Sequence, residues 1–146
     1  IVLTDRTSQL VGLRLAATLD KAGQGDAAQR LRGRIALAAG EREDPMLLLP
    51  DQAVTTPCAG VAQWLGLLAD GLARVPNGNT KLPLLFSRAA FWLNDADWAV
   101  RATLVEALDR NGQRDAAAAL IDSGRAELPP VLAMRRKMPR CVMNRQ

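Results

Sequence analysis

Residues 19–31 read LDKAGQGDAAQRL, and residues 108–120 read LDRNGQRDAAAAL. Eight of the 13 positions are identical, and Lys21 and Arg110 conserve a positive charge at a ninth position. The shared Gly-Gln-x-Asp-Ala-Ala core contains residues that a general bias towards alanine does not generate. We therefore interpret the two stretches, which lie 89 positions apart, as copies of one structural unit.

Each copy has the pattern of a helix, a tight turn and a second helix. Before the turn, leucines four residues apart, such as Leu104 and Leu108, share one helical face. Gly23 and Gly112 fall where the first helix must stop, and glycine enters the left-handed conformation of a helix end without penalty. The aspartate three residues after each glycine is expected to cap the next helix by accepting backbone N–H groups.

These residues resemble the tetratricopeptide repeat family, whose units of about 34 residues are helix hairpins. The second copy matches the family pattern at Leu104, Leu108, Gly112, Ala117, Ile121 and Pro129. It departs from the pattern at Arg101, Val105 and Gly124, where the family usually has tryptophan, a small residue and alanine. The resemblance implies an all-α fold, an αα-hairpin superhelix or solenoid of about three antiparallel helix pairs.

The first copy carries about half of the same pattern. It matches at Leu15, Leu19, Gly23 and Ala28, whereas Arg32 replaces the hydrophobic residue of the second helix and Gly40 replaces the closing proline. The pattern is therefore degenerate, and other αα-solenoids stay open as interpretations.

A third hairpin is predicted between the two copies from periodicity alone. Thr56-Pro57 has the form of a helix start, and Pro76-Asn77-Gly78 interrupts the helix that follows it. A nearly apolar second helix is predicted at 83–93, with Asn94 or Asp95 ending it and capping the next. We expect one domain over residues 1–130, with hairpins at about 8–40, 56–94 and 95–128, a linker at 41–55, and a basic tail or the start of a further unit at 131–146.

Composition limits the chemistry that the chain can perform. Its 146 residues include no histidine, which removes the commonest general base and metal ligand. The net charge is +4, but five basic residues lie after residue 130, so the body is near neutral and nucleic acid is disfavoured as a partner. Cys58 and Cys141 are expected to be two independent thiols. We expect no enzymatic activity, no cofactor, no metal, and no apolar stretch of the about 20 residues needed to span a membrane.

All aromatic residues lie in one stretch of the chain, at Trp64, Phe86, Phe91, Trp92 and Trp98. Trp92 belongs to the most apolar predicted helix and is expected in the core. Trp64 and Trp98 are open to partial exposure. A convergent, exposed set of tryptophans would favour stacking of sugars or bases.

Arrays of helix hairpins build an extended surface from their first helices, and such surfaces bind a peptide or a partner helix. The resemblance places candidate partner-binding residues on the outward side of these helices, at Arg14, Asp20, Lys21, Thr103, Glu106, Asp109 and Arg110. The competing interpretation is an ordinary solvated helix face with charge pairs.

The sequence therefore predicts a non-enzymatic protein–protein interaction or scaffolding module, with a protein or peptide in a helix-lined groove and polysaccharide as a second ligand class. A composition rich in alanine and arginine suggests a bacterial protein. The expected setting is an envelope, secretion or polysaccharide-export assembly, in the periplasm or the cytoplasm, with the periplasm favoured. The alternatives are the non-catalytic helical part of a cell-wall or polysaccharide-processing enzyme, and a nucleic-acid binder that uses its basic tail.

Overall fold

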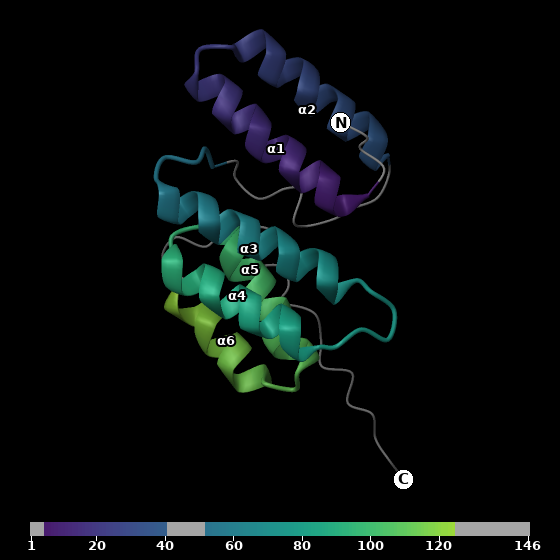
Figure 1. Cartoon of the computed structure of the whole chain (residues 1–146), viewed down its shortest axis with the longest axis vertical. Coiled ribbons are helices and arrows are strands. Elements are labelled where there is room, and N and C mark those ends of the chain that lie inside the picture. The colour runs from purple at the N-terminus through teal and green to yellow at the C-terminus, as the bar shows by residue number, and fades with distance from the viewer. Residues whose placement is uncertain (1–4, 41–51, 125–146) are drawn as a thin grey trace.

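The computed structural model describes residues 5–40 and 52–124, and this part of the chain contains helices and no strand (Figure 1). In chain order the helices are α1 (Arg6–Lys21), α2 (Gly25–Ala39), α3 (Pro57–Ala73), α4 (Lys81–Leu93), α5 (Trp98–Arg110) and α6 (Arg114–Ser123). The all-α prediction is thus confirmed for the described residues. Most of the predicted linker, the end of the third hairpin after residue 124 and the basic tail lie outside them.

Consecutive helices pack in pairs, α1 with α2, α3 with α4, and α5 with α6. Helix α5 also contacts both α3 and α4, so α3–α6 form one packed body. The α1–α2 pair lies at one end of this body and meets it through contacts of α1 with α3 (Figure 1). The odd-numbered helices are therefore neighbours. None of the described helices combines the length and the apolar character needed to cross a membrane.

The core of the body lies where α4, α5 and α6 meet. Helix α5 is at its centre, because seven of its 13 residues are buried. The buried apolar cluster consists of Leu84, Leu104, Val105, Ala107, Leu108 and Ala117, and Phe91, Leu120 and Ile121 pack partly against it. Leu104, Leu108 and Ala117, which the sequence pattern of the second copy places in the packing, are buried, whereas Leu15 of the first copy is 38% exposed.

The two repeated turns have the same backbone geometry. Gly23 and Gly112 both adopt the left-handed conformation, with φ of 76° and 74°. In each turn the backbone N–H of the following glutamine donates to the carbonyl oxygen of the leucine five residues earlier, at 2.8 and 2.9 Å. The capping role predicted for the aspartates is wrong, because Gln24 and Gln113 are the N-caps, without a side-chain cap hydrogen bond. The aspartates lie in the first helical turn, where their charge still favours the positive end of the helix dipole.

The middle hairpin begins as predicted and differs in its second helix. The Thr56 side chain accepts a hydrogen bond from the backbone N–H of Ala59 at 3.1 Å, and Pro57 occupies the first position of α3. Helix α4 begins at Lys81, two residues before the predicted start. Pro83 does not stop it, because proline is tolerated in the first turn, where its missing N–H would have no helical partner.

Arg101 joins three helices at the position where the tetratricopeptide pattern has tryptophan. Its guanidinium lies over the rings of Phe91 and Trp98, 5.2 and 5.1 Å from their centres, and donates to the carbonyl oxygen of Leu120 at 3.2 Å. A Cβ on Gly124 would lie only 2.8 Å from Arg101 and from the Trp98 ring. The presence of arginine at 101 and of glycine at 124 is therefore coupled. The side chains of Arg101 and Trp98 fill the space that an alanine at position 124 would need.

Candidate functional site

A buried ion pair joins α1 to the start of α5. Each terminal nitrogen of Arg14 lies 3.2 Å from one carboxylate oxygen of Asp97. Asp97 is also the N-cap of α5 and accepts the backbone N–H groups of Ala99 and Val100 at 2.9 and 3.3 Å. Only 1% of this side chain is exposed. The guanidinium and the helix N-terminus together compensate the charge in the interior. The cap expected at 94 or 95 thus lies two or three residues further along the chain.

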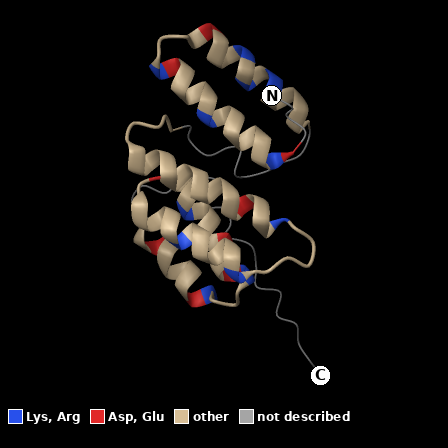
Figure 2. Ribbon diagram, viewed as in Figure 1, with Lys and Arg blue, Asp and Glu red and all other residues tan. Residues whose placement is uncertain are grey.

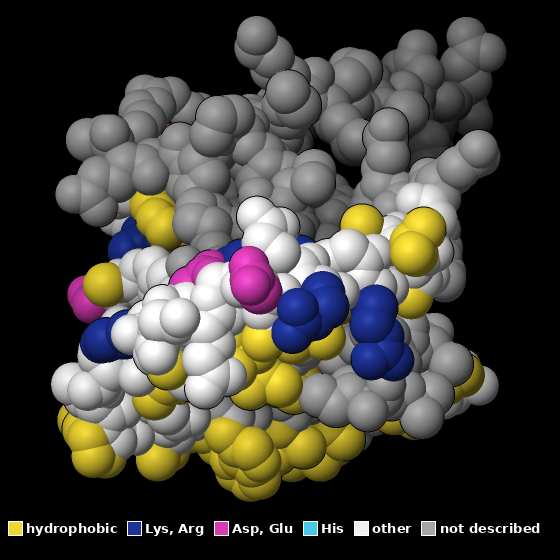
Figure 3. All heavy atoms as spheres, turned by 90° about the horizontal axis from the view of Figure 1, so that it is seen from above, with side chains coloured by type: hydrophobic (Ala, Val, Ile, Leu, Met, Phe, Trp, Pro, Cys, Tyr) yellow, Lys and Arg dark blue, Asp and Glu magenta, His cyan; other side chains and the backbone are white. Residues whose placement is uncertain are grey.

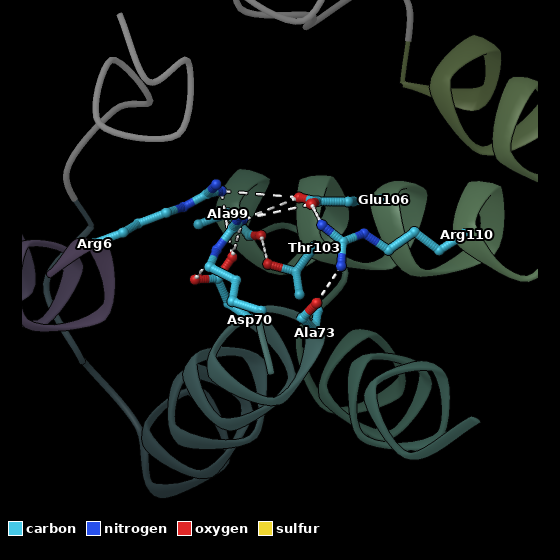
Figure 4. Close-up of polar contacts among 8 residues, drawn as sticks. Arg6, Asp70, Ala73, Ala99, Thr103, Glu106 and Arg110 are labelled. Carbon is cyan, nitrogen blue, oxygen red and sulfur yellow. Dashed lines mark hydrogen bonds and ion pairs between the residues drawn. The ribbon is translucent and has the colours of Figure 1, made fainter. Parts of the chain in front are cut away.

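A second charged cluster lies between α1, α3 and α5 (Figure 4). Asp70 of α3 is 2% exposed and pairs with Arg6 of α1 at 3.3 Å and with Arg74 at 3.0 Å. Glu106 of α5 lies 3.4 Å from Arg74 and 2.9 Å from Arg110. Arg110 also donates to the carbonyl oxygen of the last residue of α3. These contacts connect α1, α3 and α5.

Four of the seven predicted partner-binding residues take part in holding the helices together. Arg14, Glu106 and Arg110 belong to the two charged clusters, and Thr103 is buried, with its hydroxyl donating to the Ala99 carbonyl oxygen at 2.8 Å. The expectation that Arg14 and Thr103 point outward is wrong, because α1 and α3 cover this side of α5.

The other three predicted residues, Asp20, Lys21 and Asp109, are exposed. Asp20 pairs with Arg32 of α2, and Asp109 lies 3.5 Å from Arg114. The structure does not bring these three residues to one place, since Asp20 and Lys21 end α1 while Asp109 ends α5. Their role in binding stays a prediction.

Between α1, α3 and α5 lies a cavity of about 10 Å³, lined by Leu10, Arg14, Gln63, Gly66, Leu67, Asp70, Ala99, Val100 and Thr103. This volume is close to that of a single water molecule. In the described part of the chain, no three histidine, cysteine or acidic side chains lie close enough to hold a metal ion. Cys58 is a free, exposed thiol, and Cys141 lies outside the described residues.

Large apolar side chains are exposed on α3 and α4, on the side away from α5. Gly66 of α3 lies against Val100 of α5, and Leu84 of α4 belongs to the apolar cluster of α5, so the exposed rows of both helices are directed away from α5. We call this surface the tryptophan face, and it consists of Val61, Trp64, Leu82, Leu85 and Trp92. In Figure 3, hydrophobic side chains gather along the lower edge of the picture. This edge is the side of the molecule that faces the viewer in Figure 1.

The prediction that Trp92 lies in the core is wrong, because 84% of this residue is exposed. Helix α4 buries Pro83, Leu84, Ser87 and Ala90. A residue two positions after Ala90 is rotated by about 200° around the helix and therefore faces solvent. Trp64, for which the sequence left partial exposure open, is 62% exposed. Trp98 is half-buried beside Arg101.

Two exposed cations of α4 accompany the tryptophan face, while the nearest exposed acid in the sequence, Asp95, lies two residues after the end of α4. Lys81, Leu85, Arg88 and Trp92 are all exposed and lie at spacings of four, three and four, which places them in one row along α4. Arg88 donates one hydrogen bond to the side-chain oxygen of Gln113, at 2.9 Å. The only charged residue of α3 is the buried Asp70, and α4 contains no acid (Figure 2).

Neither the Asp70 cluster, with Arg6 and Arg74, nor the tryptophan face was predicted from the sequence. The signal for the first was an acid inside a run of apolar residues, with an arginine four positions later. The signal for the second was that 83–93 is nearly apolar all round, which is more than one buried side requires. Comparison of the chain with protein-family models, with curated proteins and with solved structures found no match in any of the three.

Proposed function

We propose that the chain is a non-enzymatic scaffolding module, built as an array of three helix hairpins similar to tetratricopeptide repeats, that docks onto another component of a larger assembly. Pairwise packing of consecutive helices, contacts between neighbouring odd-numbered helices and the shared geometry of the two repeated turns support this architecture. A bacterial envelope, secretion or polysaccharide-export assembly is the proposed setting, and composition alone supports it.

The tryptophan face is the observation that carries the proposal. Burying apolar surface stabilises a protein by about 25 cal/mol per Å², so leaving two indole rings and three aliphatic side chains in water is unfavourable. Contiguous exposed patches of this kind mark interaction sites. Tryptophan is also among the residues most enriched where binding energy is concentrated. The docking site is therefore placed on the outer side of α3 and α4, in place of the groove of odd-numbered helices that the sequence suggested.

The hydrogen bonds and ion pairs of the buried carboxylates support a structural role for these acids over a catalytic one. Asp97 is saturated by one guanidinium and two backbone N–H groups. Asp70 is paired with two arginines. Both acids lie between helices and stabilise the array, which is what a scaffold needs.

Site-specific photo-cross-linking in the native cell tests this proposal. A photoreactive amino acid is placed at position 92 and, as the control, at position 37 of α2. Trp92 and Leu37 are 84% and 85% exposed, so both positions are equally open to solvent. We expect adducts from position 92 and none from position 37. Equal labelling at both positions, or none at position 92, would contradict docking through the tryptophan face.

A further inference from the structure

We infer that the tryptophan face lies on an anionic lipid surface, an inference that rests on the docking role proposed above and names its partner. Two adjacent helices, α3 and α4, run side by side with their exposed rows directed away from α5. Such a pair can lie flat in a membrane interface without crossing it, with its apolar side chains at the boundary between headgroups and acyl chains.

The composition of the α4 row matches this environment. Lys81 and Arg88 alternate with Leu85 and Trp92 along one side of the helix. Lysine and arginine have long apolar stems with a charged end, so they extend past their apolar neighbours and reach lipid phosphates. Indole rings, which are apolar with one polar N–H, are enriched at the same depth. Helices that lie on membranes combine basic side chains with tryptophan and leucine, and long basic side chains can extend from an apolar surface to the headgroups.

The charge around the face selects an anionic surface. Acidic side chains would repel anionic lipid, and neither α3 nor α4 exposes one. The acids that both charged clusters contain lie between the helices and are paired with arginines. A second copy of the chain would bring the same cations and no acid to the contact, so it lacks charge complementarity. An apolar protein helix with acidic flanks is the remaining competitor, and the test separates it.

The experiment measures sedimentation of the full chain with vesicles of phosphatidylcholine alone and of phosphatidylcholine mixed with phosphatidylglycerol. We expect binding to the mixed vesicles only, with a blue shift of tryptophan emission as Trp64 and Trp92 leave water. Binding should weaken from 0.1 M to 1 M salt, as the screening length falls from about 10 Å to about 3 Å. Each cation raises the partition coefficient of the protein onto anionic vesicles about five-fold, so K81E/R88E should lower this coefficient at least about twenty-fold.

Face and control variants assign the binding to the tryptophan face. W92S and W64S should each remove the part of the blue shift that the substituted tryptophan contributes, and each should weaken sedimentation with the vesicles. L37S on α2 should bind like the wild type. Sedimentation that is unchanged in both W92S and K81E/R88E would overturn the inference, since another basic segment would then bind the lipid. Equal binding to neutral and anionic vesicles would overturn it as well.

The outcomes separate this inference from the proposed function. If no vesicle binds while position 92 cross-links to a protein in the cell, the lipid inference is overturned and the docking role stands. If vesicles bind through the face and the cell adducts at position 92 carry lipid, both stand. If neither vesicles nor cell components contact position 92, both fall.

Discussion

Asp97 performs two tasks at one position, because its carboxylate caps the first turn of α5 and also receives Arg14 from α1. Residues that cap a helix usually lie at the surface, where water completes their hydrogen bonding. Here the cap is 1% exposed. A single side chain therefore contributes both to the start of α5 and to its contact with α1, and its replacement separates the capping contribution from the charge contribution.

We predict that D97A lowers the free energy of unfolding by about 3 kcal/mol, because it removes the cap and leaves the Arg14 guanidinium without its carboxylate. D97N keeps a good N-cap and loses only the charge, so we expect a smaller loss, about 1.5 kcal/mol. Urea denaturation followed by circular dichroism measures both. A D97A protein as stable as the wild type would show that Arg14 and the helix end find other partners.

The coupling of Arg101 with Gly124 gives a second prediction. G124A should destabilise the chain by about 1 kcal/mol or more, because the new Cβ meets the Trp98 ring and a guanidinium held by three hydrogen bonds. G33A, in the interior of α2 where a Cβ meets nothing, should stabilise it by about 0.5 kcal/mol. Thermal unfolding of both variants, together with R101A/G124A, checks this. A penalty for G124A that persists in full beside R101A would exclude the coupling and leave Trp98 as the sole cause.

At the scale of elements, the repeated turn shows how much of the fold is locally encoded. A glycine with φ near +75° and a hydrogen bond back to a leucine occur twice, 89 residues apart, with the same flanking sequence. A Cβ added at either glycine would meet no atom within 4 Å. The turns are therefore determined by backbone conformation and not by packing.

An alanine at either position loses stability only because it must adopt the left-handed backbone conformation. G23A and G112A should therefore lower the free energy of unfolding by similar amounts, about 1 kcal/mol each. Asparagine tolerates the left-handed region better than alanine, so G23N and G112N should lose less. Chemical denaturation of the four variants gives the comparison. Unequal losses at the two glycines would mean that one turn is held by contacts beyond its own backbone.

The start of α3 and the glycines of the repeated turns could be predicted from the sequence because they depend on neighbours a few positions away. Thr56-Pro57 and the leucines of the repeat are features of this local kind. Trp92 and Asp97 are not, since their surroundings depend on which helices meet. Trp92 could not be placed because the sequence of a nearly apolar helix such as α4 does not indicate which side is covered by other helices. The burial of Asp97 could not be predicted because its partner Arg14 comes from a distant helix.

For the whole molecule, the tryptophan face is distinct from the residues that join the helices. Trp64 and Trp92 have most of their surface in water, so their replacement removes little of the packing that folds the chain. The charged clusters on the other side have the opposite character, because their residues join α1, α3 and α5. None of the residues in these ion pairs belongs to the tryptophan face.

We therefore predict that W92S changes the free energy of unfolding by no more than about 0.5 kcal/mol, as is usual for exposed positions. The same variant should bind less of a fluorescent dye that reports exposed apolar surface. Denaturation and dye titration of W92S beside L37S test the two statements. A large loss of stability in W92S would assign this indole a packing role within the fold.

All five aromatic residues lie on α3, α4 and α5, so the α1–α2 pair contains no chromophore that absorbs in the near ultraviolet. Melting of that pair alone would pass unnoticed by intrinsic fluorescence, while the far-ultraviolet ellipticity of two of the longer helices would fall. If the arginine contacts of α1 break before the body unfolds, the two signals will give different midpoints. If a single cooperative transition governs the chain, the curves will superimpose.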